Sequence, residues 1–191
     1  MNKKKFASLL VAGALTLGLV GGSLAWFTSQ DSVTNSFTTG KTQEEGKDGI
    51  KVVETFDSEK AQNLTPGTRV EKDVQVKNTA TYDQFVRVKF TKTFNKEGLD
   101  TNYINLVFTN KLGTDWLQDG QWYYYIGKLS ASQGTTQLLD AVILNSAAGN
   151  EYKGVGFNVK VEAEGIQASN NAYTQWVDGN SVIGKKLAAI Q

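Results

Sequence analysis

The clearest pattern in the chain is an alternation of hydrophobic and polar positions with a period of two residues. Residues 155–164 carry Val, Phe and Ala at the odd positions, with polar residues at the even positions from 158 onward. Residues 86–90 alternate in the same way. Because side chains of a strand point alternately to its two faces, this pattern predicts half-buried β-strands. We predict further strands at 70–78, 122–126 and 138–144, the last being also compatible with a short helix.

Turn residues separate these segments and indicate the fold class. Asp119-Gly120 lies between two aromatic segments and predicts a β-hairpin. Pro66-Gly67 predicts a type II turn, since proline fixes its φ and glycine accepts a positive φ. Residues 171–177 are compatible with one or two helical turns, but no helical pattern alternates with the strands. We therefore predict an all-β fold, a single-domain jelly-roll-like β-sandwich with a short helical segment at most.

The N-terminal residues have the pattern of a secretory signal peptide. Lysines at residues 3–5 precede an uncharged apolar run at 6–20, and Ser23-Leu24-Ala25 is a small-x-small cleavage site. We predict cleavage by a signal peptidase between Ala25 and Trp26, with a retained anchor helix as the alternative. The whole chain has a formal charge of +1, and the chain without the signal peptide is also close to neutral. This balance does not suggest nucleic acid as a partner.

The absence of two residue types excludes much catalytic and metal-binding chemistry. The sequence contains no His and no Cys, which rules out a Ser-His-Asp triad, a thiol nucleophile and the usual zinc ligands. Paired carboxylates of the glycosidase kind would remain, and we weigh them as a minor alternative. We expect no catalytic residue, no metal and no cofactor. The aromatic residues Trp116 and 122–125 are interpreted as core and sheet face, with a sugar-binding platform as the alternative.

The segment that follows the leader is unusual for a free N-terminus. Trp26, Phe27, Val33 and Phe37 stand among Ser, Thr and Asn residues. Val33 and Phe37 are four residues apart and would share one face of an extended strand. The segment is either the first strand of its own domain or a strand given to another molecule by β-strand addition.

The expected organisation of the chain has three parts. Residues 1–25 form the signal peptide, and residues 26–48 form an N-terminal donor strand with a flexible connector. Residues 49–191 form the jelly-roll-like β domain.

Several stretches along the chain resemble the TasA/camelysin family of exported proteins. The leader and the mature start resemble those of the family. The Leu-x-Pro-Gly turn and the Val-x-Asn that follows it resemble an internal motif of the family. An Ile-Gln-Ala segment, followed by Asn, Ala and Trp, resembles the signature near the end of the family domain. Within that family, the chain is most similar to the BsaA-like clostridial members. The stretches are residues 21–28, 31–41, 64–68, 76–80 and 166–176.

The resemblance implies a secreted structural subunit of extracellular biofilm matrix fibres, located in the matrix or at the cell surface. It implies export through a dedicated SipW-type signal peptidase and a head-to-tail homopolymer, in which each copy donates its N-terminal strand to the next. The donor residues would be Trp26, Phe27, Val33 and Phe37. A surface anchor or an accessory matrix protein is a further possible partner.

The resemblance also raises the question of catalysis. Camelysin has been classed as a metallopeptidase, but the lack of His leads us to expect no enzymatic activity here. A secreted carbohydrate-binding β-sandwich module is the alternative function.

Overall fold

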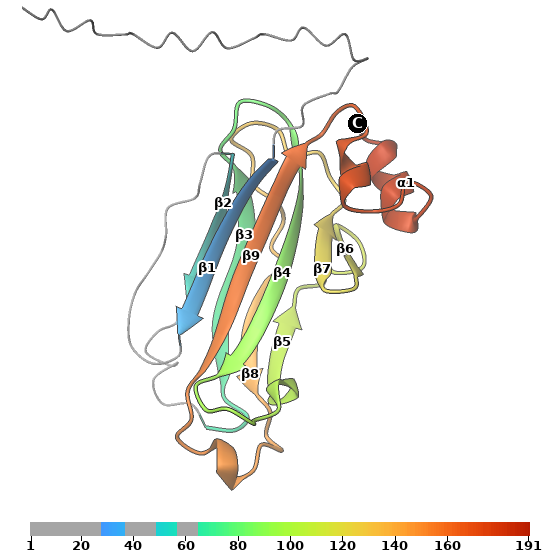
Figure 1. The fold of residues 1–191 in the computed structure, drawn as a ribbon. Coiled ribbons are helices and arrows are strands. Elements are labelled where there is room, and N and C mark those ends of the chain that lie inside the picture. Colours follow the sequence, from blue (N-terminus) through green and yellow to red (C-terminus); the bar gives the residue numbers. More distant parts are fainter. Residues whose placement is uncertain (1–27, 37–48, 57–64) are drawn as a thin grey trace, which may run out of the picture.

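The computed structural model describes residues 28–36, 49–56 and 65–191, with side chains described from residue 49 onward. In these ranges the strands form two antiparallel sheets packed face to face (Figure 1). The five-stranded sheet has the order β1 (Thr28–Ser36), β9 (Phe157–Gln167), β4 (Gln84–Phe94), β7 (Trp122–Tyr125) and β6 (Trp116–Asp119). The four-stranded sheet has the order β2 (Ile50–Phe56), β3 (Arg69–Asn78), β8 (Leu139–Leu144) and β5 (Ile104–Phe108).

The connections between strands repeatedly pass from one sheet to the other. The chain crosses between the sheets after β1, β3, β4, β5, β7 and β8. Such crossing connections between two sheets are typical of jelly-roll sandwiches. The predicted all-β sandwich is confirmed, and in the segment 138–144 residues 139–144 form a strand, β8, rather than a helix. Short helices complete the described fold: η2 (Thr101–Tyr103), η3 (Asn150–Tyr152), η4 (Ala172–Gln175) and α1 (Val182–Ala188).

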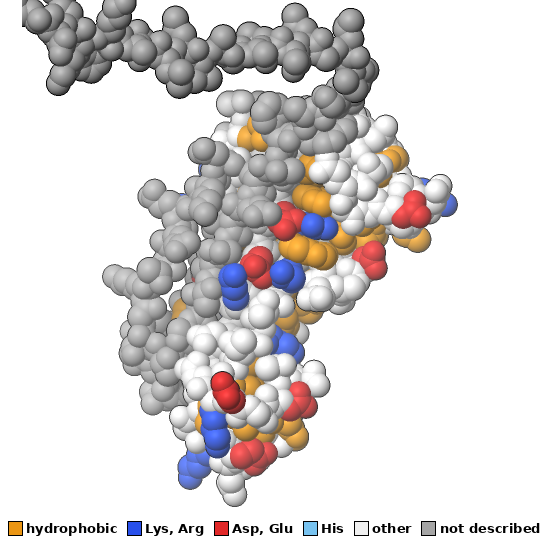
Figure 2. All heavy atoms as spheres, viewed as in Figure 1, with side chains coloured by type: hydrophobic (Ala, Val, Ile, Leu, Met, Phe, Trp, Pro, Cys, Tyr) orange, Lys and Arg blue, Asp and Glu red, His pale blue; other side chains and the backbone are white. Residues whose placement is uncertain are grey.

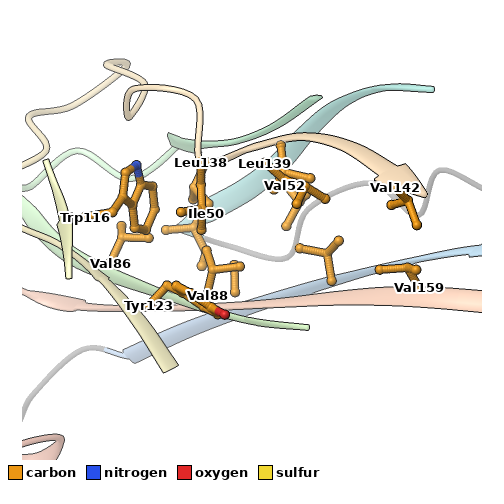
Figure 3. Packing of buried hydrophobic residues seen from close by; sticks show 14 of the residues in the cluster. Ile50, Val52, Val86, Val88, Trp116, Tyr123, Leu138, Leu139, Val142 and Val159 are labelled. Atoms are coloured by element: carbon orange, nitrogen blue, oxygen red, sulfur yellow. The ribbon is translucent and has the colours of Figure 1, made fainter. Parts of the chain in front are cut away.

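The main core lies between the two sheets and is built from the alternating positions. In β9, Phe157, Val159 and Val161 are buried, whereas Asn158 and Lys160 between them are only partly buried. Figure 3 shows side chains of both sheets pointing into the space between them. The period-two pattern of the sequence therefore identifies the core face correctly. Labelled members of this core are Ile50, Val52, Val86, Val88, Trp116, Tyr123, Leu138, Leu139, Val142 and Val159.

A second, smaller core lies on the outer face of the five-stranded sheet. The C-terminal segment with η4 and α1 packs there (Figure 1). The ring centroids of Phe85 from β4 and Tyr173 from η4 are 6.3 Å apart in an edge-to-face arrangement. This second core explains why β7 carries aromatic residues on both faces, since Tyr123 joins the main core and Tyr124 joins the outer one.

Both turns predicted from the sequence are present in the structure, one of them shifted by one residue. The Pro66-Gly67 turn is present, because Thr68 N–H donates to Thr65 C=O at 2.9 Å and Gly67 has φ 89°. The hairpin between β6 and β7 also forms, but its turn is shifted by one residue. Asp119 pairs with Trp122, so Gly120 is the first central residue, with φ 56°. Primed hairpin turns require that positive φ, and glycine adopts it without strain.

Candidate functional site

The first strand, β1, forms an edge of the five-stranded sheet and pairs with β9 along its whole length. Its backbone register runs from Thr28 opposite Ile166 to Ser36 opposite Asn158. On its other side, β9 pairs with β4. β1 therefore provides the second row of backbone partners for β9. Removal of β1 would leave the N–H and C=O groups of β9 as an open strand edge.

The strands that flank β1 present a hydrophobic surface to the interior. Val159, Val161 and Ala163 of β9, with Ile50 and Val52 of β2, are each at most 4% exposed. β2 is an edge strand of the four-stranded sheet, and it lies on the same side of the sandwich as β1 (Figure 1). We call these five residues the β1-binding surface. These residues belong to the core between the two sheets, and β9, which carries three of them, pairs with β1 along its length.

The residues predicted from the sequence for this site fall into two groups. Ala25, Trp26, Phe27 and Phe37 lie outside the described residues. Val33 belongs to β1, and its backbone pairs with that of Val161. In the single chain, β1 thus completes the sheet of its own domain. Its donation to a second copy stays a prediction.

The aromatic residues considered as a sugar-binding platform do not form one patch. Trp116 is fully buried, and Tyr123 beside it also faces the main core. Trp122 and Tyr124 belong to the outer core on the opposite face of the sheet. A platform for stacking sugars requires rings exposed side by side, which this arrangement does not offer. These rings form core and sheet face, as interpreted from the sequence.

The outer face of the five-stranded sheet carries a cross-strand arrangement that the sequence did not reveal. The guanidinium carbon of Arg87 lies 4.1 Å from the ring centroid of Trp122 and 4.7 Å from that of Trp176. Arg87 Nη2 is 2.6 Å from Glu164 Oε2. Two residues further along the same pair of strands, Lys89 Nζ is 3.1 Å from Glu162 Oε2. Figure 2 shows acidic and basic side chains close together on this face, with hydrophobic side chains beside them.

A buried ion pair lies inside the sandwich near the C-terminal end of β2. Lys72 Nζ of β3 is 2.6 Å from Glu54 Oε2 of β2, and the two side chains are 0% and 4% exposed. Burial lowers the pKa of Lys72, although the charge and hydrogen bond of Glu54 act in the opposite direction. Sequence reasoning missed this pair. Its signal was available, because Lys72 has the same alternation phase as Val70, Val74 and Val76.

The described residues offer no metal centre. In residues 49–56 and 65–191, no group of three or more His, Cys, Asp or Glu side chains could hold a metal ion. The full sequence contains no His or Cys, the ligands that zinc prefers in proteins. The residues present therefore do not fit a zinc site. In the same described ranges, no helix has the length and hydrophobicity needed to cross a bilayer.

The fold and the edge position of β1 define this chain as a two-sheet β-sandwich protein. In a comparison with protein families, residues 1–125 match the family described as camelysin metallo-endopeptidase. The chain belongs to this family, the TasA/camelysin family. No curated protein and no solved structure matches the chain. The metallopeptidase activity in that family description requires a metal, and the residues of this chain do not fit a zinc site.

Proposed function

We propose that the exported chain is a structural subunit that polymerises into extracellular biofilm matrix fibres by donating its N-terminal strand to the next subunit. Membership in the TasA/camelysin family fits a secreted matrix protein at an extracellular or surface location. The observation that carries the finer proposal is the edge position of β1. A strand at an edge leaves the sheet without separating any other pair of strands.

The register of β1 supports exchange between identical copies. Every residue of β1 has a partner in β9, and a β1 from a second copy would find the same row of backbone groups. Antiparallel pairing of this length contributes several backbone hydrogen bonds, each with a net effect of about 0.5–1.5 kcal/mol. The acceptor would also regain burial of the β1-binding surface. Because donor and acceptor surfaces differ, repeated donation gives an open, head-to-tail filament.

The sequence between β1 and β2 is long enough for this exchange. Residues 37–48 separate the two described strands. A chain of this length spans at most about 40 Å when fully extended. That distance exceeds the length of β1 itself, which is about 30 Å at 3.3 Å per residue. The strand of one copy is therefore able to reach an adjacent copy.

Export and assembly are linked in this proposal. Cleavage between Ala25 and Trp26 by a SipW-type signal peptidase would free the start of the donor segment. Trp26, Phe27, Val33 and Phe37 are proposed to bind the acceptor, with an anchor or accessory matrix protein as a further partner. The leader would hold the segment back until the chain has crossed the membrane.

Truncation tests the proposal. A chain that begins at Trp26 is expected to form fibres, whereas one that begins at Gly49 lacks the donor strand and is expected to stay monomeric. Electron microscopy and size-exclusion chromatography check the two forms. Equal fibres from both would overturn the donor-strand proposal.

A point variant gives a milder test with a matched control. Phe37→Asp places a charge in the donor segment and is expected to prevent assembly without unfolding the domain. Gln43→Asp adds the same charge in the connector and is expected to assemble normally. Circular dichroism checks that both variants remain folded. Assembly of the Phe37→Asp variant at the unaltered rate would contradict the proposed role of that side chain.

A further inference from the structure

The strand β5 has a sequence that pairs readily with other strands, although it lies at an edge. It ends the four-stranded sheet on the side of the sandwich away from β1 and β2 (Figure 1). Its sequence, Ile-Asn-Leu-Val-Phe, carries no charge, and its Ile, Val and Phe residues favour strands. An uncharged hydrophobic edge strand is a template on which another chain can pair. A second copy of this chain would carry the same edge.

The register of β5 shows which of its backbone groups face the open edge. Asn145 N–H donates to Tyr103 C=O at 2.8 Å, which makes these residues a hydrogen-bonded pair at the start of the strand. Hydrogen-bonded and non-hydrogen-bonded pairs alternate along an antiparallel ladder. Ile104 and Leu106 therefore belong to non-hydrogen-bonded pairs with β8, and they direct their N–H and C=O groups to the open edge. The register shifts after Val107, so the regular row ends there.

The chain itself occupies both outward groups of Ile104. Its N–H donates to the C=O of Thr101 in η2. Its C=O accepts a hydrogen bond from Lys92 Nζ of β4 at 2.9 Å. Before the register shift, an incoming strand would therefore find at most the groups of Leu106, which are too few for a ladder.

Lys92 reaches Ile104 from the interior of the sandwich. In β4 it has the same alternation phase as Val88 and Phe90, which pack in the main core. Because it donates to a carbonyl of the other sheet, its aliphatic stem crosses between the sheets and its ammonium group lies at the edge. Burial lowers the pKa of Lys92, although the charge of Asp100 acts in the opposite direction. A leucine or methionine would extend the core at this position, so packing alone does not explain a lysine.

The position of this ammonium group opposes the addition of a strand to β5. A strand that pairs with Ile104 takes the carbonyl oxygen away from Lys92. The same strand covers the ammonium group, and a buried charge without a partner is strongly unfavourable. Charged residues that point inward near a sheet edge are a recognised means by which natural β-sheets prevent pairing between edges.

The neighbouring edge strand on this side, β6, is covered by the loop that precedes it. Trp116 N–H donates to Lys111 C=O at 3.0 Å, and Trp116 C=O accepts from Gly113 N–H at 2.7 Å. The position of β1 differs from both of these edges, since β9 pairs there with all nine residues of β1. A continuous row of backbone partners is thus present at the β1 position and interrupted at β5 and β6.

We propose that Lys92 closes the β5 edge to a second copy of this chain, so that strands are added only at the position of β1. The closure of β5 follows from contacts within one chain. The restriction of growth to β1 rests on the proposed function, and it would keep the fibre a single row of subunits.

Substitution of Lys92 in the chain that begins at Trp26 tests the inference. Lys92→Met removes the charge and the donor but keeps an unbranched side chain, and we expect this variant to associate through β5. Light scattering after size-exclusion chromatography should show a doubled mass for the soluble protein, and electron microscopy should show any fibres joined side by side. Hydrogen–deuterium exchange should show slower exchange in residues 104–108 of the associated form.

Two outcomes would overturn the inference. One is a folded Lys92→Met variant with the same mass, the same fibres and the same exchange as the unsubstituted chain. The other is association without slower exchange in residues 104–108, because the contact would then lie elsewhere. Circular dichroism checks the fold. Should the methionine variant not fold, Lys92→Gln removes the charge with a smaller change in polarity, and the same outcomes decide.

Two control variants separate closure of the edge from a general effect of charge. Lys92→Arg keeps the charge and the donors, and it is expected to behave as the unsubstituted chain. Lys89→Met removes the same charge from the outer face of the same strand, where Lys89 is paired with Glu162, and it is expected not to associate through β5. Association of the Lys89→Met variant to the same extent as Lys92→Met would contradict the role of Lys92.

The outcomes also separate this inference from the fibre proposal. Lys92→Met dimers from a chain that never forms fibres would support the closure of β5 and count against strand donation. Single fibres from every variant, with unaltered exchange in residues 104–108, would support strand donation and overturn the role of Lys92. Single fibres from the unsubstituted chain and paired fibres from Lys92→Met would support both.

Discussion

The stacking of Arg87 between two tryptophans gives a prediction that can be worked out from the structure. Arg87 lies 4.1 Å from the ring centroid of Trp122 in the sheet and 4.7 Å from that of Trp176, which follows η4. It also donates from Nε to Glu164 Oε2 at 2.8 Å. The guanidinium thus connects the five-stranded sheet to the C-terminal segment that covers its outer core.

A double-mutant cycle isolates the contact between Arg87 and Trp176. A cation–π contact contributes about 0.5–1 kcal/mol at exposed sites and about 2 kcal/mol when desolvated. The side chain of Arg87 is only 15% exposed, so we expect a coupling of about 1 kcal/mol. Arg87→Met, Trp176→Leu and the double variant are compared with the unsubstituted domain. Urea unfolding, followed by far-UV circular dichroism, gives the free energy of unfolding of each.

A control cycle uses the neighbouring cation. Lys89 lies 5.0 Å from the ring centroid of Trp122, and Lys89→Met is therefore expected to show no coupling to Trp176→Leu. Distant mutations usually add to within about 0.3–0.5 kcal/mol. A coupling between Arg87 and Trp176 inside that margin would refute the stacking argument. It would mean that Glu164 and Trp122 hold the guanidinium without a contribution from Trp176.

Two further predictions concern packing and pH. Gly184→Ala should destabilise the domain by about 1–2 kcal/mol, because overpacking at the Asp178 carbonyl oxygen outweighs the helix-propensity gain of about 1 kcal/mol. The control variant Gly134→Ala adds a methyl group that meets only ordinary contacts, and it should change stability by less than about 0.5 kcal/mol. Equal effects of the two variants in thermal unfolding would contradict the reasoning. For Glu162, partial burial raises the pKa, but hydrogen bonds and charges from Lys160 and Lys89 lower it by more, so its pKa is below the ordinary value of 4.5. The stabilisation that Glu162 contributes is then present above pH 4.5 and is lost as pH falls through its lowered folded-state pKa. The unsubstituted domain should therefore lose more stability on acidification than the Glu162→Gln variant. Identical dependence of urea unfolding on pH in the two proteins would contradict this prediction.

The strands could be predicted from the sequence because burial on one face leaves a period of two. In β9, Val159 and Val161 alternate with Lys160 and Glu162, and no other regular structure produces that pattern. The turn at Pro66 was equally accessible, since its conformation is set by local chemistry. These features depend on residues that are close together in the sequence.

The features that escaped prediction depend on contacts between distant residues. Helix α1 is only seven residues long, which is too short for a clear helical period. Its start is stabilised by Ser181, whose side chain accepts a hydrogen bond from Gly184 N–H at 2.9 Å. It forms because Ile183 and Leu187 pack on the outer core of the sheet. The aromatic pair around Arg87 likewise combines residues from β7 and from the segment after η4.

The candidate site shows the same division. The sequence singled out Val33 as part of a donor strand, and the structure places it in β1, opposite Val161. It did not single out Lys72, because a single lysine in a strand is ordinarily an exposed residue. Only the pairing of β2 with β3 shows that Glu54 lies beside it. The partner strand of β1 was also unknown, because strand order is set by long-range pairing.

The most direct test of strand donation asks which chain provides the partner of β9. Thr34 is opposite Lys160 in the register, and the sequence contains no native Cys, so one cysteine at each position reports on this pair alone. Antiparallel neighbours are close enough for a disulfide. We expect a mixture of the Thr34→Cys chain and the Lys160→Cys chain, oxidised under assembly conditions, to yield disulfide-linked heterodimers that neither chain yields alone. No heterodimer from the mixture, with only an internal disulfide in the chain that carries both cysteines, would contradict strand donation.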